Sequence, residues 1–216
     1  MNEPGLRERK KQRMYQTVSE IAIALFLEKG FDAVSVAEVA AAAEISKPTL
    51  FRYFPAKEDL VLHRIADHED ESARVVREAT GRGTAPLPAL RRHFLDGLHR
   101  LDPVTGLNDH PAVLAFHRLL YGTPALAARA TAYVEQSESA LAAALADTLD
   151  SAVDARLAAA QIVAVQRVLA LENWRRIADG EQVEAVRGDA VAAAERAFDR
   201  LAVGWPELAP RPTATQ

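Results

Sequence analysis

Apolar residues recur at helical spacing along almost the whole chain, and no segment alternates with the two-residue period of a half-buried strand. The clearest run predicts an amphipathic helix from about Arg9 to Lys29, ended by Gly30 in the usual C-terminal glycine position. Its apolar stripe consists of Val18, Ile21, Ala22, Leu25 and Phe26. We therefore expect an all-α fold.

Length and composition narrow the class of protein further. A chain of 216 residues, 49% of them hydrophobic, can bury a substantial core. The chain has no cysteine, which excludes disulfides, thiolate zinc sites and cysteine nucleophiles. No window approaches the roughly eighteen apolar residues of a membrane span. We expect a cytoplasmic protein that does not enter the membrane and carries no cofactor.

Two short helices with serine caps follow the first predicted helix. Ser35 and Glu38 have the spacing of a capping box, which predicts a helix from Val36 to about Ala43. After a tight turn, Ser46 is placed to cap a second helix, which runs to about Tyr53. Pro48 is compatible with the first turn of that helix, and Pro55 prevents much extension. These segments predict a compact three-helix head.

The rest of the chain predicts a larger helical body, for a total of about nine helices. A single connecting helix is expected over 57–79, followed by a glycine- and proline-rich linker at 80–88. Further helices are expected at about 87–101, 111–121, 124–149, 154–179 and 184–203. The predicted divisions are a head (1–56), the connecting helix (57–79), a body (80–204) and a disordered tail (205–216).

The second capped helix carries an unusual concentration of basic and aromatic residues. If Ile45, Leu50 and Phe54 face the core, its other face shows the side chains of Lys47, Thr49, Phe51, Arg52 and Tyr53. Such a helix fits the major groove of DNA, where lysine and arginine donate to phosphates or guanine. Phe51 has no hydroxyl and can offer only apolar contact, for example to a thymine methyl. The alternative is that the two aromatic residues belong to the core and the basic groups are simply solvated.

The charge distribution favours the interpretation that this head meets a polyanion. Residues 1–64 carry ten basic and nine acidic side chains, whereas the other 152 carry sixteen and twenty-one. Five of the basic side chains lie within the first thirteen residues. A basic N-terminal arm on a neutral head and an acidic body indicates that only the head meets a polyanion, although a charged N-terminus is also typical of a solvated tail.

The stretch VAEVAAAAEISKPTLFRYFPAKEDLV resembles the DNA-binding signature of the TetR family of bacterial transcriptional regulators. The resemblance covers about residues 10–65. Phe51 stands where the family often has tyrosine, and Pro48 where it often has glycine or alanine. The matching positions are Ser35, Val39, Ala40, Ile45, Ser46, Thr49, Leu50, Tyr53, Phe54, Lys57, Glu58 and Leu60.

The resemblance implies roles for individual residues. Thr49, Tyr53 and Lys57 would position the head on the phosphate backbone, and Ser35 and Ser46 would cap their helices beside it. Lys47, Pro48, Phe51 and Arg52 would lie nearest the bases, although Arg52 can also reach phosphate. The arm residues Arg9, Lys10, Lys11 and Arg13 would lie along or in the minor groove.

The resemblance also implies a homodimer and an effector. Helices at about 154–179 and 183–203 would form a two-fold interface, although both could instead pack inside the monomer. The body would enclose a pocket for a small hydrophobic effector that releases the repressor from a palindromic operator. Candidate pocket residues, each more typical of a core, helix-end or interface position, are Phe94, Leu98, Phe116, His117, Leu120, Tyr121, Tyr133, Gln166, Asn173 and Trp174.

Two other classes of protein compete with a regulator. An enzyme is disfavoured because the six histidines show no metal-binding spacing and the chain has no phosphate loop or nucleophile elbow. We therefore expect no catalytic residues and no metal site. A helical scaffold without DNA binding would require the signature segment to be coincidental.

Overall fold

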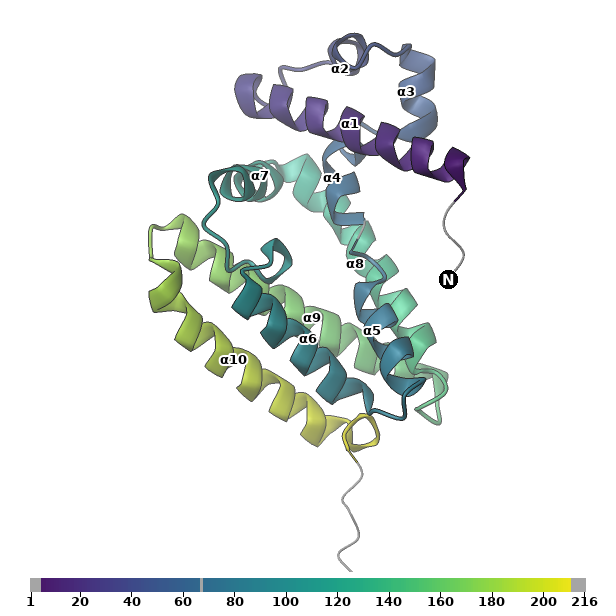
Figure 1. The fold of residues 1–216 in the computed structure, drawn as a ribbon, viewed down its shortest axis with the longest axis vertical. Helices are drawn as coiled ribbons and strands as arrows, with labels where there is room; N and C mark the ends of the chain where they lie inside the picture. Colours follow the sequence, from purple (N-terminus) through teal and green to yellow (C-terminus); the bar gives the residue numbers. More distant parts are fainter. Residues whose placement is uncertain (1–4, 67, 211–216) are drawn as a thin grey trace, which may run out of the picture. The chain divides into compact units, whose positions relative to one another are not determined.

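The computed structural model describes residues 5–66 and 68–210, without the side chains of residues 6–8, and its secondary structure confirms an all-α fold (Figure 1). Within these residues there are ten α-helices and two short 3-10 helices. The α-helices are α1 (Leu6–Lys29), α2 (Val36–Ala42), α3 (Lys47–Tyr53), α4 (Asp59–Ala66), α5 (Glu71–Thr80), α6 (Pro86–Arg100), α7 (Pro111–Gly122), α8 (Pro124–Leu145), α9 (Ala152–Ala178) and α10 (Val183–Gly204). The 3-10 helices are η1 (Pro103–Thr105) and η2 (Pro206–Leu208).

The chain forms two compact units whose boundaries differ from the predicted ones. Of the described residues, the first contains 5–66 together with 115–133, and the second contains 68–114 together with 134–210. Residues 115–133 join the first unit because Phe116, Leu120 and Leu126 are buried in one core with residues of α1 and α4. Burial of apolar surface, which is the main favourable term in folding, thus groups segments that are distant in sequence.

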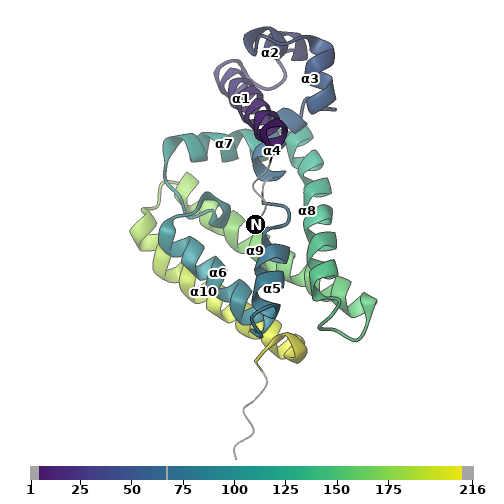
Figure 2. The ribbon, with the colours of Figure 1, turned by 45° about the vertical axis from the view of Figure 1, so that its right-hand side comes forward.

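The core of the first unit follows the predicted apolar stripes. Val18, Ala22 and Phe26 of α1 are buried, whereas Ile21 and Leu25 are half-buried. Leu50 of α3 and the following Phe54 are buried in the same core. In Figures 1 and 2, α2 and α3 lie together along one side of α1.

Two helices replace the single connecting helix predicted for 57–79. α4 ends at Ala66, α5 begins at Glu71, and His68 to Asp70 form a turn. Three successive carboxylates at positions 69–71 repel one another, and aspartate has low helix propensity. The break therefore falls in the most acidic segment of this region.

The second unit is built mainly from α5, α6, α9 and α10. Figures 1 and 2 show α6 and α10 running side by side, and both contribute to one apolar core with α9. The loop after α6 lies directly on α9, where a Cβ added at Gly106 would come within 1.9 Å of the Ala170 carbonyl oxygen. The buried amide of Asn173 donates to the Thr105 carbonyl oxygen at 2.9 Å and fixes the same loop.

The C-terminal segment is more ordered than predicted. Pro206–Leu208 form η2, and Leu208 is fully buried in the core of the second unit. The Trp205 Nε1–H also donates to Gln161 Oε1 at 3.0 Å. The prediction of a disordered tail from residue 205 is therefore wrong as far as residue 210, because an apolar side chain anchors it. Residues 211–216 lie outside the described part of the chain.

Candidate nucleic-acid interface

The turn between α2 and α3 is set by the backbone of Glu44. Its φ of 54° lies in the left-handed region, which is sterically unfavourable for a residue that has a Cβ. The Glu44 N–H donates to the Ala41 carbonyl at 3.1 Å, and the Ile45 N–H donates to the Ala40 carbonyl at 3.0 Å. This pair of hydrogen bonds is a Schellman motif, which ends α2 and directs the chain into α3.

Serine hydroxyls cap both short helices as predicted. The Glu38 N–H donates to Ser35 Oγ at 3.2 Å, and the Ser35 N–H donates to Glu38 Oε2 at 3.0 Å, completing the capping box. The Ser35 hydrogen bond and the nearby Lys29 ammonium hold the pKa of Glu38 below its usual range. At α3, the Thr49 N–H donates to Ser46 Oγ at 3.2 Å. The two hydroxyls of Ser46 and Thr49 also lie 2.8 Å apart.

The outer face of α3 presents the predicted basic and aromatic side chains. Lys47, Pro48, Phe51 and Arg52 are exposed, and Phe51 retains 41% of its accessible surface. The Lys47 ammonium lies 5.9 Å from the centroid of the Phe51 ring. Such a contact restrains both side chains on the same side of the helix, one turn apart.

Tyr53 and Arg52 make packing contacts within the first unit that the sequence did not predict. The half-buried Tyr53 ring makes an edge contact with Tyr15 of α1, with centroids 5.1 Å apart. The Arg52 guanidinium lies 5.4 Å from the centroid of the Tyr53 ring. Tyr15 also stacks on His63 of α4 at 4.7 Å. Sequence reasoning missed Tyr15, which precedes the predicted apolar stripe of α1 and carries no sequence signal of these contacts.

Lys57 is occupied by contacts within the unit. Its ammonium donates to the Phe31 carbonyl oxygen at 2.5 Å and lies over the rings of Phe31 (4.4 Å) and Phe26 (5.5 Å). An ammonium has three donors, so a phosphate contact is compatible with this arrangement. The first role of Lys57 seen here is to tie the start of α4 to the connection between α1 and α2.

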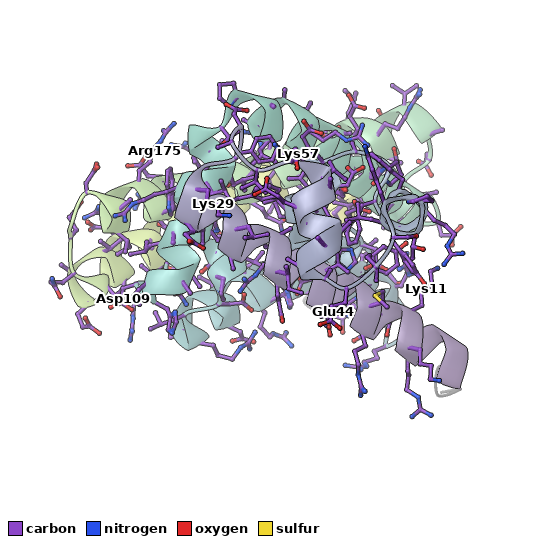
Figure 3. All side chains as sticks on the ribbon, turned by 90° about the horizontal axis from the view of Figure 1, so that it is seen from above. Lys11, Lys29, Glu44, Lys57, Asp109 and Arg175 are labelled. Carbon is purple, nitrogen blue, oxygen red and sulfur yellow. The ribbon has the colours of Figure 1, made fainter. Side chains whose placement is uncertain are left out.

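The basic residues near the N-terminus belong to a helix rather than an extended arm. α1 already begins at Leu6, so Arg9, Lys10, Lys11 and Arg13 occupy its first turns, where all four are exposed. No helix-breaking residue follows Gly5 in this segment. Figure 3 shows Lys11 and Lys29 toward opposite ends of α1.

The predicted pocket residues fall into two sets, one in each unit. In the first unit, Phe116 and Leu120 are buried, His117 and Tyr133 are half-buried, and Tyr121 is exposed. Burial and the positive charge of Arg64 lower the pKa of His117 to about 4. The Arg64 guanidinium lies 5.2 Å from the centroid of the Phe116 ring.

In the second unit, most of the predicted pocket residues have packing or bonding roles. Phe94 and Leu98 are buried in the core, with the Phe94 ring 6.2 Å from that of Phe198. Gln166 Oε1 accepts a hydrogen bond from the Ser72 hydroxyl at 3.0 Å. Asn173 fixes the loop after α6, and Trp174 is half-buried beside it.

A short, capped helix bearing exposed lysine, arginine and aromatic side chains, set after a second short helix across a tight turn, defines a helix-turn-helix DNA-binding protein. Residues 20–63 match the sequence profile of the bacterial regulatory proteins of the tetR family. The chain is 33% identical over 181 residues to the HTH-type transcriptional regulator TcmR of Streptomyces glaucescens, covering 81% of this chain and 79% of TcmR. The chain belongs to the TetR family and is a DNA-binding transcriptional regulator.

Solved structures share the fold at low sequence identity. NalD, the secondary repressor of the MexAB-OprM multidrug efflux pump of Pseudomonas aeruginosa, aligns with a TM-score of 0.54 at 17% identity, over 88% of this chain and 96% of NalD. FadR of Bacillus subtilis, solved with stearoyl-CoA, aligns with a TM-score of 0.52 at 16% identity, over 88% of this chain and 98% of FadR. Within the described residues, no helix is long and apolar enough to cross a membrane, and no cluster of three or more side chains is suited to hold a metal ion.

Proposed function

We propose that the protein is a ligand-responsive repressor that binds a palindromic operator as a homodimer and is released by a small hydrophobic effector. The observation that carries this proposal is the outer face of α3, where Lys47, Phe51 and Arg52 are exposed. A single exposed phenylalanine is ordinary on a protein surface, but here it lies between basic side chains on a short, serine-capped helix that follows a tight turn. A DNA groove supplies both phosphates and thymine methyl groups as partners.

The docking of the head follows from the geometry of α3. Lys47 and Pro48 lie in its first turn, the end from which helix-turn-helix proteins contact base edges. Ser35, Ser46 and Thr49 lie at the N-termini of α2 and α3, where free backbone N–H groups also favour phosphate. The Tyr53 hydroxyl, Lys57 and the basic first turns of α1 add further phosphate contacts in this proposal.

The dimer is supported by an apolar face on α9. Val153, Leu157 and Val168 share one side of this helix and retain 53%, 49% and 56% of their accessible surface. Val203 near the end of α10 retains 85%. We assign this face to a second copy of the chain, because a two-fold dimer presents two α3 helices to the two halves of a palindrome.

The effector response rests on the class of protein and on two of the solved relatives. NalD is a repressor, and FadR was solved with an acyl-CoA, which is consistent with a hydrophobic effector here. Effector binding in the body would move α4 and change the separation of the two α3 helices. Specific affinity would then fall, because the two helices could no longer enter successive major grooves.

Selection of binding sites from fragmented genomic DNA, followed by mobility shifts at two salt concentrations, tests the proposal. We expect a palindromic site whose binding weakens steeply with salt, by a log–log slope of roughly 0.9 for each phosphate contacted. A thermal-shift screen of metabolites, followed by release assays on the selected site, then identifies the effector. Failure to enrich any sequence would refute operator binding, and an effector that always tightens binding would refute release.

A further inference from the structure

The segment that leads from α3 into α4 is fixed by two charged side chains. Lys57 ties it to the Phe31 carbonyl, as described above. Two residues later, Asp59 Oδ2 accepts a hydrogen bond from the Ala56 N–H at 3.0 Å. Only five residues separate the end of α3 from Asp59, so we expect a displacement of this carboxylate to shift the end of α3 as well.

Asp59 is paired with an arginine seventy residues further along the chain. Arg129 of α8 donates from Nε to Asp59 Oδ1 at 3.0 Å and from a terminal guanidinium nitrogen to Oδ2 at 3.3 Å. This two-point contact fixes direction as well as distance. The Asp59 side chain is only 9% exposed, whereas that of Arg129 is 46% exposed.

The unequal exposure makes the pair responsive to the position of α8. If α8 moved away, Arg129 would be hydrated at once, but the buried Asp59 carboxylate would lose its charge partner. Breaking a buried pair in this way is far more costly than losing a surface ion pair. The turn between α3 and α4 would therefore have to rearrange whenever Arg129 withdraws.

α8 is well placed in the chain to carry such a displacement. It is one continuous helix from Pro124 to Leu145, whose residues up to Tyr133 belong to the first unit and whose later residues belong to the second. A helix transmits axial displacement and rotation along its hydrogen-bonded backbone. Arg129 thus lies in the first unit, on a helix that continues into the second.

We propose that the Asp59–Arg129 ion pair is the joint through which α8 sets the position of the start of α4, and with it the docking of α3 on DNA. The inference rests on the proposed function and identifies how that function is regulated. Both residues are positioning residues, since neither lies on the DNA-facing side of α3. The effector acts on DNA binding to the extent that it changes the equilibrium between the paired and separated states.

A double-mutant cycle on DNA affinity tests this joint. Full-length Arg129→Gln, Asp59→Asn and the double variant are titrated with the duplex selected by the wild-type protein. Asparagine retains an oxygen for the Ala56 N–H, so Asp59→Asn removes the charge but keeps the turn. We expect each single change to weaken binding by roughly ten-fold and the double change to weaken it no further. The salt slope should not change, because neither residue contacts phosphate.

Hydrogen exchange provides a readout that loss of stability alone would not reproduce. In the wild-type protein, the selected duplex should slow amide exchange in residues 134–145 of α8, beyond the first unit. In Arg129→Gln that distant protection should disappear while protection of α3 remains. Arg118→Gln, which removes an exposed arginine from α7 of the first unit, is the matched control and should behave like the wild type.

The possible outcomes distinguish a failure of this joint from a failure of the proposed DNA-binding function. Additive effects in the cycle, or retained protection of 134–145 in Arg129→Gln, would overturn the joint while leaving DNA binding intact. A wild-type protein that binds no duplex would overturn operator binding itself, and the joint with it. Partial recovery in Arg129→Lys, which keeps the charge but not the two-point contact, would support the joint.

Discussion

Phe51 is the residue at which this chain departs most informatively from its family's pattern. Its ring is exposed, lies near Lys47 on the surface of α3 and has no hydroxyl to offer a phosphate. Apolar contact with a thymine methyl is the interaction left to it in a major groove.

Replacing Phe51 should therefore change sequence preference more than overall affinity. We expect Phe51→Ala to weaken binding to the selected operator by about 1–3 kcal/mol, the usual cost of one mismatched base pair in a specific site. Replacing single thymines by deoxyuridine removes only the methyl group. At one position this replacement should weaken DNA binding by the wild-type protein but leave DNA binding by Phe51→Ala unchanged. Equal losses at every thymine would contradict this role.

Tyr53 calls for a different substitution, because its ring packs on Tyr15. Tyr53→Phe removes the hydroxyl and keeps the ring, so it isolates the proposed phosphate hydrogen bond. We expect binding to all sequences to weaken equally, with the fold unchanged by circular dichroism. A loss confined to one base position would contradict a phosphate role.

His117 should make stability depend on mildly acidic pH. Its pKa falls from an ordinary value of 6.5 to about 4 in the folded protein, through burial and the charge of Arg64. Between these values the unfolded chain binds a proton that the folded chain does not, so stability is complete above pH 6.5 and declines as pH falls toward 4.

Thermal unfolding at pH 7 and pH 5 measures this contribution. The loss of melting temperature on acidification should be smaller in His117→Gln than in the wild type, whatever the absolute stability of the variant. His99→Gln, which changes an exposed histidine, is the control. The pKa of Glu71, held low by hydrogen bonds from His68 and His93, adds a separate loss only below about pH 4.5, outside the measured interval. An unchanged pH response in His117→Gln would contradict the assignment.

At the scale of elements, the capping box at the start of α2 should contribute measurably to the free energy of unfolding. Ser35→Ala removes the acceptor for the Glu38 N–H and should lower the free energy of unfolding by about 1 kcal/mol. Chemical denaturation measures this loss. Glu38→Gln, which preserves a side-chain acceptor for the Ser35 N–H, should lose less. A larger loss in Glu38→Gln than in Ser35→Ala would show that the charge of Glu38, rather than the cap, stabilises α2.

The helices were predictable because their causes are local. Caps at Ser35 and Ser46, the apolar stripe around Val18 and the proline at position 55 act over a few residues and are visible in the sequence. The break between α4 and α5 was missed because apolar periodicity continues on both sides of the acidic turn. Anchoring of Leu208 was missed because a single leucine in a proline-rich tail carries no periodic signal.

Contacts between distant segments could not be predicted from one sequence. Nothing local marks Arg129 as the partner of Asp59, and nothing in residues 115–133 indicates that they share a core with α1. The identities of the exposed residues on α3 were predictable. The packing of Tyr53 on Tyr15 and of Lys57 on Phe31 was not, because it depends on how α1 and α4 cross.

At the scale of the whole molecule, the proposed dimer determines what kind of DNA site can be read. Leu157 and Val168 supply much of the exposed apolar surface of α9. The paired change Leu157→Glu and Val168→Glu should convert the dimer to a folded monomer, measured by light scattering during size exclusion. Burying these charges in an interface would be too costly. The monomer should bind a half-site weakly and lose the steep preference for a palindrome. A wild-type protein that is monomeric at micromolar concentration would contradict the assignment of this face.

The central claim is that the outer face of α3 reads DNA, and a titration of one variant tests it most directly. Lys47, Phe51 and Arg52 are changed together to alanine, and binding to the selected operator and to a scrambled duplex is measured by fluorescence anisotropy. The matched control changes Arg74 and Arg77 to alanine, which removes exposed arginines from α5. We predict that the triple variant retains its helical content and weak, salt-sensitive binding but no longer distinguishes the two duplexes, whereas the control does. A triple variant that still prefers the operator as strongly as the wild type would contradict the claim.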